Sequence, residues 1–188
     1  MTPTNQKKKK AELLHSENKL HKAGMGSGSE KWQDGKIRGD EIMWVNERWK
    51  LKETQPNLYE LLTRLDFLRV ELNEACKFDS SKTMVKHIPF SKNSWRTHPP
   101  LPSFFFCYKT QLACYPGNGA RYVRHLDSFV GGTNRRITCL YYMNPNWKKE
   151  DGGELRIYLN NKSKDVEPLA DRLLIFQSRR LEHEVLPS

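Results

Sequence analysis

Two histidines and an aspartate have the types and spacing of a metal site. His125 and Asp127 lie two residues apart, and His183 lies in a later segment that reads Leu-Glu-His-Glu-Val. If residues 121–127 form a strand, His125 and Asp127 point to the same face, because side chains alternate along a strand. Two histidines and one carboxylate, with open positions opposite them, are the ligands of non-haem Fe(II) oxygenases. The spacing alone leaves a second interpretation open, a chance pair beside a structural histidine.

The elements that would position these residues are short strands. Gly-rich turns separate segments rich in β-forming residues over the second half of the chain. The strands that we expect cover residues 41–45, 111–115, 121–127, 136–143, 154–159, 172–176 and 182–186. This spacing predicts a mainly β fold, a jelly-roll-like antiparallel barrel with the three residues at one mouth.

One helix is expected to support the strands. Thr54 is a candidate N-cap, Pro56 fits a first turn, and leucines recur at spacings of three and four from Leu58 to Leu72. The remaining chain has no such period. Residues 1–35 are rich in lysine, glycine and serine and predict a basic, flexible tail. The domain at 36–188 would then hold an irregular, proline-rich insertion at about 80–106.

Composition narrows the class of protein. The chain has 188 residues, a formal net charge of +10 and a mean hydropathy of −0.79. Nucleic-acid binding is therefore an alternative, and salt-sensitive retention would support it. The positive charge is spread along the chain without a nucleic-acid motif, so we expect no nucleic-acid partner.

Four cysteines without a CxxC pair favour reduced thiols in the cytoplasm or nucleus. No apolar run is long enough to span a membrane, and we expect a monomer.

Several segments resemble the prolyl hydroxylases of hypoxia-inducible factor, the EGL-nine family. The likeness covers roughly residues 36–78 and 108–187. The most specific block is Cys-Tyr-Pro-Gly-Asn-Gly at residues 114–119, followed by His125-x-Asp127. The other matching segments are Ile-Arg-Gly-Asp at 37–40, Tyr-Val-Arg-His at 122–125, Gly-Gly at 152–153, Asp-Arg-Leu-Leu at 171–174 and His-Glu-Val at 183–185.

The resemblance implies a double-stranded β-helix dioxygenase that uses Fe(II), 2-oxoglutarate and O₂, with ascorbate as reductant. Its substrate would be a proline in the oxygen-dependent degradation segment of hypoxia-inducible factor alpha. By position in the family motifs, His125, Asp127 and His183 would bind iron. The positions that match the 2-oxoglutarate pocket are Tyr115, Tyr142 and Leu155, and Arg135 matches a substrate-contacting rim.

The sequence also departs from the family pattern. In the family, an arginine nine residues beyond the distal histidine grips the far carboxylate of 2-oxoglutarate, whereas this sequence ends at Ser188. From this we expect that the barrel lacks its last strand and that the chain turns over 2-oxoglutarate poorly. The alternative function is a truncated pseudoenzyme that binds the substrate segment or a regulator without turnover, and succinate production separates the two.

Overall fold

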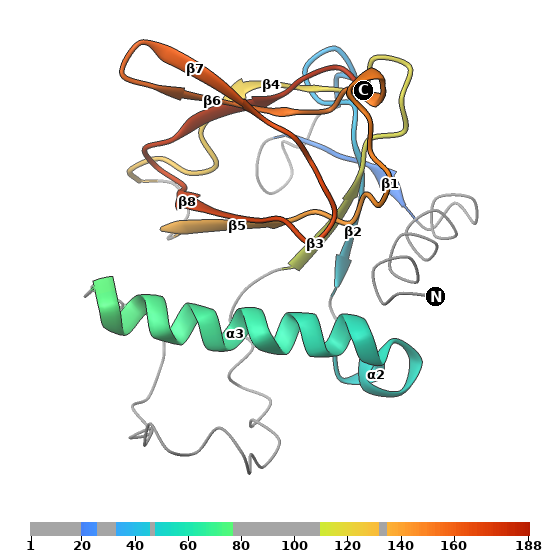
Figure 1. The fold of residues 1–188 in the computed structure, drawn as a ribbon, viewed down its shortest axis with the longest axis vertical. Helices are drawn as coiled ribbons and strands as arrows, with labels where there is room; N and C mark the ends of the chain where they lie inside the picture. Colours follow the sequence, from blue (N-terminus) through green and yellow to red (C-terminus); the bar gives the residue numbers. More distant parts are fainter. Residues whose placement is uncertain (1–19, 26–32, 46–47, 77–109, 132–134) are drawn as a thin grey trace. The chain divides into compact units, whose positions relative to one another are not determined.

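The structure, a computed structural model, describes residues 20–25, 33–45, 48–76, 110–131 and 135–188 (Figure 1). The chain divides into two compact units, Met1–Trp44 with Gln111–Ser188, and Val45–Thr110. The first unit is built of strands and contains all the candidate site residues. The described residues of the second form two helices. The predicted insertion at 80–106 lies outside the described residues, and the division into a tail and one domain stays a prediction.

The largest sheet carries two of the three candidate ligands. Its order is β4 (Tyr122–His125), β9 (Glu182–Val185), β6 (Leu155–Leu159) and β7 (Lys162–Val166), and every pair is antiparallel. Residues directly opposite each other in such a pair share a face. Because Ile157 pairs with His183 and Leu155 with Val185, these four side chains lie on one face. Polar residues such as Arg156 and Glu184 occupy the other.

A two-stranded ladder faces this sheet across the site. Strands β5 (Ile137–Tyr141) and β8 (Leu173–Gln177) pair antiparallel, with Thr138 opposite Phe176. The Phe176 ring meets the His183 ring edge-on, with centroids 4.8 Å apart. Thr138 reaches Asp127 with its hydroxyl. These contacts join the two ladders around the candidate ligands.

A third sheet has the order β1 (His21–Lys22), β2 (Glu41–Val45) and β3 (Thr110–Cys114) (Figure 1). Strand β1 lies inside residues 1–35, which we predicted to be a flexible tail. That prediction is wrong for the residues that form this strand. The physical reason is burial: Leu20 and Ala23 flank β1 and are 7% and 1% exposed. A two-residue strand is too short to produce an alternation in the sequence.

The helical unit contains α2 (Arg48–Thr54) and α3 (Pro56–Cys76). Pro56 begins α3, as predicted. Thr54 is not its N-cap, because it is the last residue of α2 and its hydroxyl donates to the carbonyl of Lys50, 2.8 Å away. Leu62 is the most buried of the apolar side chains of α3 whose burial is described, and the other leucines from Leu58 to Leu72 are half-buried.

The mainly β, antiparallel class is confirmed, and the expected strand at residues 41–45 has the predicted bounds. Two strands and α2 were not predicted. The clearest case is β7, which has the sequence Lys-Ser-Lys-Asp-Val and is exposed at four of its five positions. An edge strand with both faces in water shows no hydrophobic alternation. Among the described residues the ladders form three sheets and do not close into a complete barrel.

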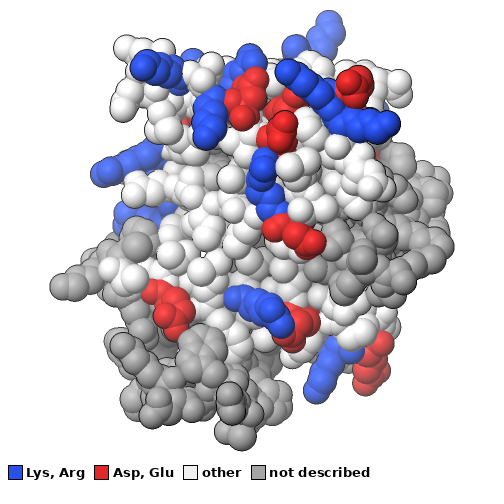
Figure 2. Space-filling view, in the orientation of Figure 1, with Lys and Arg blue, Asp and Glu red and all other residues white. Residues whose placement is uncertain are grey.

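The surface charge is mixed on the face shown in Figure 2. Lysine and arginine side chains lie there among aspartate and glutamate side chains. Ion pairs among the described residues include Arg156 with Asp165, whose side-chain atoms are 2.7 Å apart. No helix in the described part of the chain is long and apolar enough to cross a membrane.

Candidate metal centre

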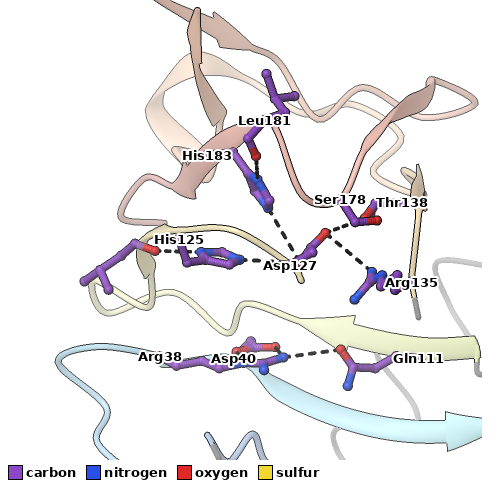
Figure 3. Close-up of polar contacts among 11 residues, drawn as sticks. Arg38, Asp40, Gln111, His125, Asp127, Arg135, Thr138, Ser178, Leu181 and His183 are labelled. Atoms are coloured by element: carbon purple, nitrogen blue, oxygen red, sulfur yellow. Dashed lines mark hydrogen bonds and ion pairs between the residues drawn. The ribbon is translucent and has the colours of Figure 1, made fainter. Parts of the chain in front are cut away.

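The side chains of His125, Asp127 and His183 converge on one point (Figure 3). Their potential ligand atoms all lie within 4.8 Å of one another. Asp127 Oδ1 is 3.6 Å from Nε2 of His125 and 3.8 Å from Nε2 of His183. The centroids of the two imidazole rings are 4.4 Å apart. The predicted grouping of these three residues therefore exists in the fold.

The strand that was expected to carry both His125 and Asp127 ends earlier than predicted. Strand β4 stops at His125, and Asp127 lies just beyond it in a bend. The pairing of β4 with β9 shifts register between Tyr122 and His125, and His125 then lies opposite His183. The backbone N–H of Ser128 donates to the carbonyl of Ser178, 3.1 Å away, which secures the bend. Asp127 thus reaches the site from a bend that this bond holds.

Each histidine is oriented by a carbonyl of its own segment. Nδ1 of His125 lies 2.7 Å from the carbonyl oxygen of Val123, and Nδ1 of His183 lies 3.0 Å from that of Leu181. Because a carbonyl can only accept, each Nδ1 must carry the proton. In the neutral ring Nε2 then has a free lone pair, and it faces Asp127. Burial lowers the pKa of His183, which keeps this ring neutral at pH 7.

Asp127 is held in its ionised form. Burial on its own would raise its pKa, but His125, Arg135, Thr138 and His183 together bring the pKa down to about 2. Nη2 of Arg135 lies 3.5 Å from Oδ2, and the Thr138 hydroxyl donates to the same oxygen at 2.5 Å. The site therefore offers one anion and two imidazole nitrogens, a donor set that fits a divalent transition metal such as Fe(II).

Aromatic rings enclose the histidines. The Tyr122 ring stacks on His125 with centroids 3.7 Å apart, and Phe176 meets His183 edge-on. The guanidinium of Arg38 lies over the Tyr122 ring, 4.6 Å from its centroid. Arg38 also makes two bonds, at 2.7 and 3.0 Å, to Asp40, which is 1% exposed. These groups hold the ring planes and limit the approach of water.

The residues predicted for the 2-oxoglutarate pocket lie at strand ends of the same unit. Tyr115 follows β3, Tyr142 follows β5, and Leu155 begins β6. Leu155 is 2% exposed and shares the sheet face of His183. Burial raises the pKa of Tyr142 to about 12 and also raises that of Tyr115, so both hydroxyls keep their protons at neutral pH. Each can donate to an anion.

Arg135 lies close to the candidate ligands. Its guanidinium is 47% exposed and ion-paired with Asp127. Arg135 lies two residues before β5. The role of each pocket and rim residue stays a prediction.

Sequence reasoning overlooked the groups that support the ligands. Thr138 and Ser178 are 1% and 0% exposed, and the Thr138 hydroxyl joins Ser178 to Asp127. Phe176 and Tyr122 provide the ring contacts. The available signal was strand parity: Thr138 and Phe176 both occupy inward positions of strands that we had predicted. Which ligand each would reach depends on the packing of two sheets, which no local pattern encodes.

Residues 110–188 match the 2OG-Fe(II) oxygenase superfamily. The human "Prolyl hydroxylase EGLN3" is 57% identical to this chain over 156 residues, which cover 81% of this chain and 54% of the relative. The rat "Egl nine homolog 1" is 51% identical over 156 residues, 81% of this chain and 38% of the relative. The chain thus spans about half of the length of the human relative, and less of the rat one.

Two solved structures are similar in fold. A Pseudomonas putida prolyl-4-hydroxylase superposes with a TM-score of 0.72 at 26% identity, covering 99% of this chain and 80% of that one. A Trichoplax adhaerens prolyl hydroxylase, solved with a peptide fragment of the hypoxia-inducible factor oxygen degradation domain, gives a TM-score of 0.66 at 27% identity. That match covers 100% of this chain and 73% of the other. The oxygenase fold that we expected is confirmed.

Proposed function

Because this chain is a homologue of the EGLN prolyl hydroxylases and carries a 2OG-Fe(II) oxygenase domain at residues 110–188, we propose that it hydroxylates proline in a peptide substrate. The substrate that we propose is the oxygen-dependent degradation segment of hypoxia-inducible factor alpha. The observation that carries the proposal is the cluster of His125, Asp127 and His183. The Trichoplax relative, which was solved with a fragment of such a segment, supports the choice of substrate.

We assign the two histidines and Asp127 as the ligands of Fe(II). When bound, iron with 2-oxoglutarate and O₂ supplies the oxidising chemistry, in which one oxygen atom enters a proline C–H bond and 2-oxoglutarate becomes succinate and CO₂. The chain would hold the ion through the Nε2 atoms of the two histidines and a carboxylate oxygen of Asp127, and this would leave coordination positions for the cosubstrates. Ascorbate is the reductant that we propose.

The pocket residues would bind and orient the 2-oxo acid. The protonated hydroxyls of Tyr115 and Tyr142 are donors for its carboxylates, since burial raises both pKa values. Leu155, fully buried beside the ligand-bearing strand, would form an apolar wall that excludes water. Arg135, half-exposed next to Asp127, would contact the substrate peptide at the rim.

Two further proposals concern the cellular setting. We place the protein in the cytoplasm or the nucleus, which agrees with cysteine usage that contains no CxxC pair. We also propose that the catalytic unit acts as a monomer, because all three ligands come from one chain and one compact unit.

The test is a coupled assay on the 188-residue chain. The chain is incubated with Fe(II), ascorbate, 2-oxoglutarate, O₂ and a proline-containing peptide from hypoxia-inducible factor alpha. We expect slow succinate release and a peptide that gains one oxygen atom at the proline. A peptide with alanine at that position, and the His183→Ala chain, are the matched controls. Metal-loaded chain that releases succinate but leaves the peptide unmodified would overturn the proposed substrate, and metal-loaded chain that releases no succinate would favour the pseudoenzyme.

A further inference from the structure

A pair of buried hydroxyls stands behind the candidate metal centre. Thr138 lies in β5, and Ser178 directly follows β8. They are 1% and 0% exposed, and their oxygens are 2.8 Å apart (Figure 3). The proposed reaction gives neither a role. Two hydroxyls with so little access to water must satisfy each other or a neighbouring group.

The direction of both hydrogen bonds follows from Asp127. An aspartate that serves as a metal ligand is a carboxylate, and a carboxylate only accepts hydrogen bonds. The Thr138 hydroxyl therefore donates its one proton to Asp127 Oδ2, 2.5 Å away. With that proton committed, the contact between Thr138 and Ser178 needs Ser178 as the donor. The chain of donation runs from Ser178 to Thr138 to Asp127.

The two oxygens of Asp127 consequently face different partners. Oδ2 receives Thr138 and lies 3.5 Å from the guanidinium of Arg135. Oδ1 lies closest to the two histidine Nε2 atoms, at 3.6 and 3.8 Å. A carboxylate that is free to rotate could present both oxygens to an ion and so occupy a position that a cosubstrate needs. The bond from Thr138 opposes that rotation.

We propose that Ser178 and Thr138 are positioning residues that restrict Asp127 to binding metal through Oδ1 alone, an inference that rests on the proposed metal centre. Ser178 acts by turning the Thr138 proton toward Asp127. It is well placed to do so, because its N–H donates to the carbonyl of Arg136 at 2.9 Å and its carbonyl accepts from Ser128 at 3.1 Å. Ser178 thus joins the entry of β5 to the bend that carries Asp127.

Two substitutions of Thr138 separate this role from simple packing. Thr138→Val keeps the branched shape and removes the hydroxyl, whereas Thr138→Ser keeps the hydroxyl and removes the methyl group. The readout is the affinity for Co(II), a spectroscopic substitute for Fe(II), titrated by visible absorption without 2-oxoglutarate. We expect Thr138→Val to weaken Co(II) binding roughly tenfold to a hundredfold, the usual effect of losing a partner of a metal ligand. Thr138→Ser should bind within about twofold of the unsubstituted chain.

A merely structural Thr138 predicts the reverse order, with Thr138→Ser weaker and Thr138→Val unchanged, and that result would overturn the proposal. Thermal unfolding of both metal-free variants shows whether packing has changed. If Thr138→Val unfolds, Ser178→Ala gives a second measurement, with an expected loss of roughly two- to tenfold in affinity. In the variant that combines Thr138→Val with Ser178→Ala, the Ser178→Ala substitution should cause no further loss of Co(II) affinity, because Ser178 acts only through Thr138.

The outcomes also distinguish this inference from the proposed function. If the unsubstituted chain binds no Co(II), the metal centre is wrong and the inference is overturned with it. If the chain binds Co(II) and the Ser178→Ala and Thr138→Val losses add independently, only the donor chain is overturned. The proposal is supported if the losses of Co(II) affinity in Ser178→Ala and Thr138→Val are coupled and Thr138→Ser retains its Co(II) affinity.

Discussion

The two histidines of the candidate metal centre each give their Nδ1 proton to a carbonyl two residues earlier, and this fixes which nitrogen is available to an ion. Asp127 supplies the only negative charge among the three. Its ionised form is already stabilised by Thr138 and Arg135, so the ion does not have to displace a proton from it. Metal affinity should therefore depend strongly on this one carboxylate.

Asp127→Ala should weaken Co(II) or Fe(II) binding at least roughly a hundredfold, because the anionic ligand is lost outright. Isothermal titration with the metal ion measures the change. Asp165→Ala is the matched control, since Asp165 is also ion-paired with an arginine, Arg156, but lies on the outward face in β7. Parental affinity in Asp127→Ala would show that the metal is bound elsewhere.

Tyr142→Phe should raise the KM for 2-oxoglutarate roughly tenfold to a hundredfold with a smaller change in kcat. A hydrogen bond to a charged group contributes about 1.5–3 kcal/mol, and the substitution removes only the hydroxyl. Tyr141→Phe is the control, because the neighbouring tyrosine donates to Asp171 and sits on the opposite side of the strand. Steady-state succinate release measures both. Equal KM values for the two variants would exclude Tyr142 from the pocket.

At the scale of elements, the turn that leads into β6 depends on a close approach of two backbones. Gly152 has φ of +64°, and its N–H donates to Lys149. A Cβ at this position would lie 2.2 Å from the carbonyl oxygen of Pro187. Gly153 donates to the same carbonyl at 3.1 Å. Glycine is required here for both conformation and space.

Gly152→Ala should therefore lower the free energy of unfolding by about 1–3 kcal/mol, the range for a strained backbone position. Gly35→Ala should change it by less than about 0.5 kcal/mol, since a Cβ at Gly35 meets nothing within 4 Å. Urea unfolding of both variants gives the comparison. Equal stabilities would mean that the segment around Pro187 moves away without cost.

Strands were predictable where residues with high β-propensity stand between Gly-rich turns. Residues 41–45 and the core of β5, β6, β8 and β9 follow this rule, and their ends were misplaced by one or two residues at most. Strand β7 was missed because four of its five residues are exposed. The β6–β7 turn at Asn160 and Asn161, both with positive φ, carries the signal that could have revealed it.

At the scale of the whole molecule, metal binding and folding should be linked. The ligands come from β4, the bend after it and β9, and these meet only in the folded chain. An ion that binds only the folded state stabilises that state by about 2.7 kcal/mol when the free ion concentration is a hundred times the Kd. For a chain of this size we expect a rise in Tm of roughly 5–10 °C.

Differential scanning calorimetry with Co(II), with and without a chelator, measures this rise. The chelator should abolish it, and Asp127→Ala should show little of it. Arg156→Ala, which removes an outward-facing ion pair, should keep the full shift. A shift that persists in Asp127→Ala would point to metal binding by other groups.

The site was predictable as far as residue spacing and the family resemblance reach. His125, Asp127 and His183 were identified from their types and order, although Asp127 lies in a bend rather than on the expected strand. Thr138, Ser178 and Phe176 were not assigned to the site. Their contacts arise from the packing of one ladder against another, so each depends on a residue between 7 and 40 positions away in sequence, with no common motif.

The most direct test of the account is the position of the bound metal. Crystals of the chain grown with Fe(II) or Co(II) without oxygen, measured on both sides of the metal absorption edge, give an anomalous map. We predict one strong peak bounded by Nε2 of His125, Nε2 of His183 and Oδ1 of Asp127, with Oδ2 of Asp127 still bonded to Thr138. A metal-loaded crystal whose peak lies away from these three side chains would contradict the account.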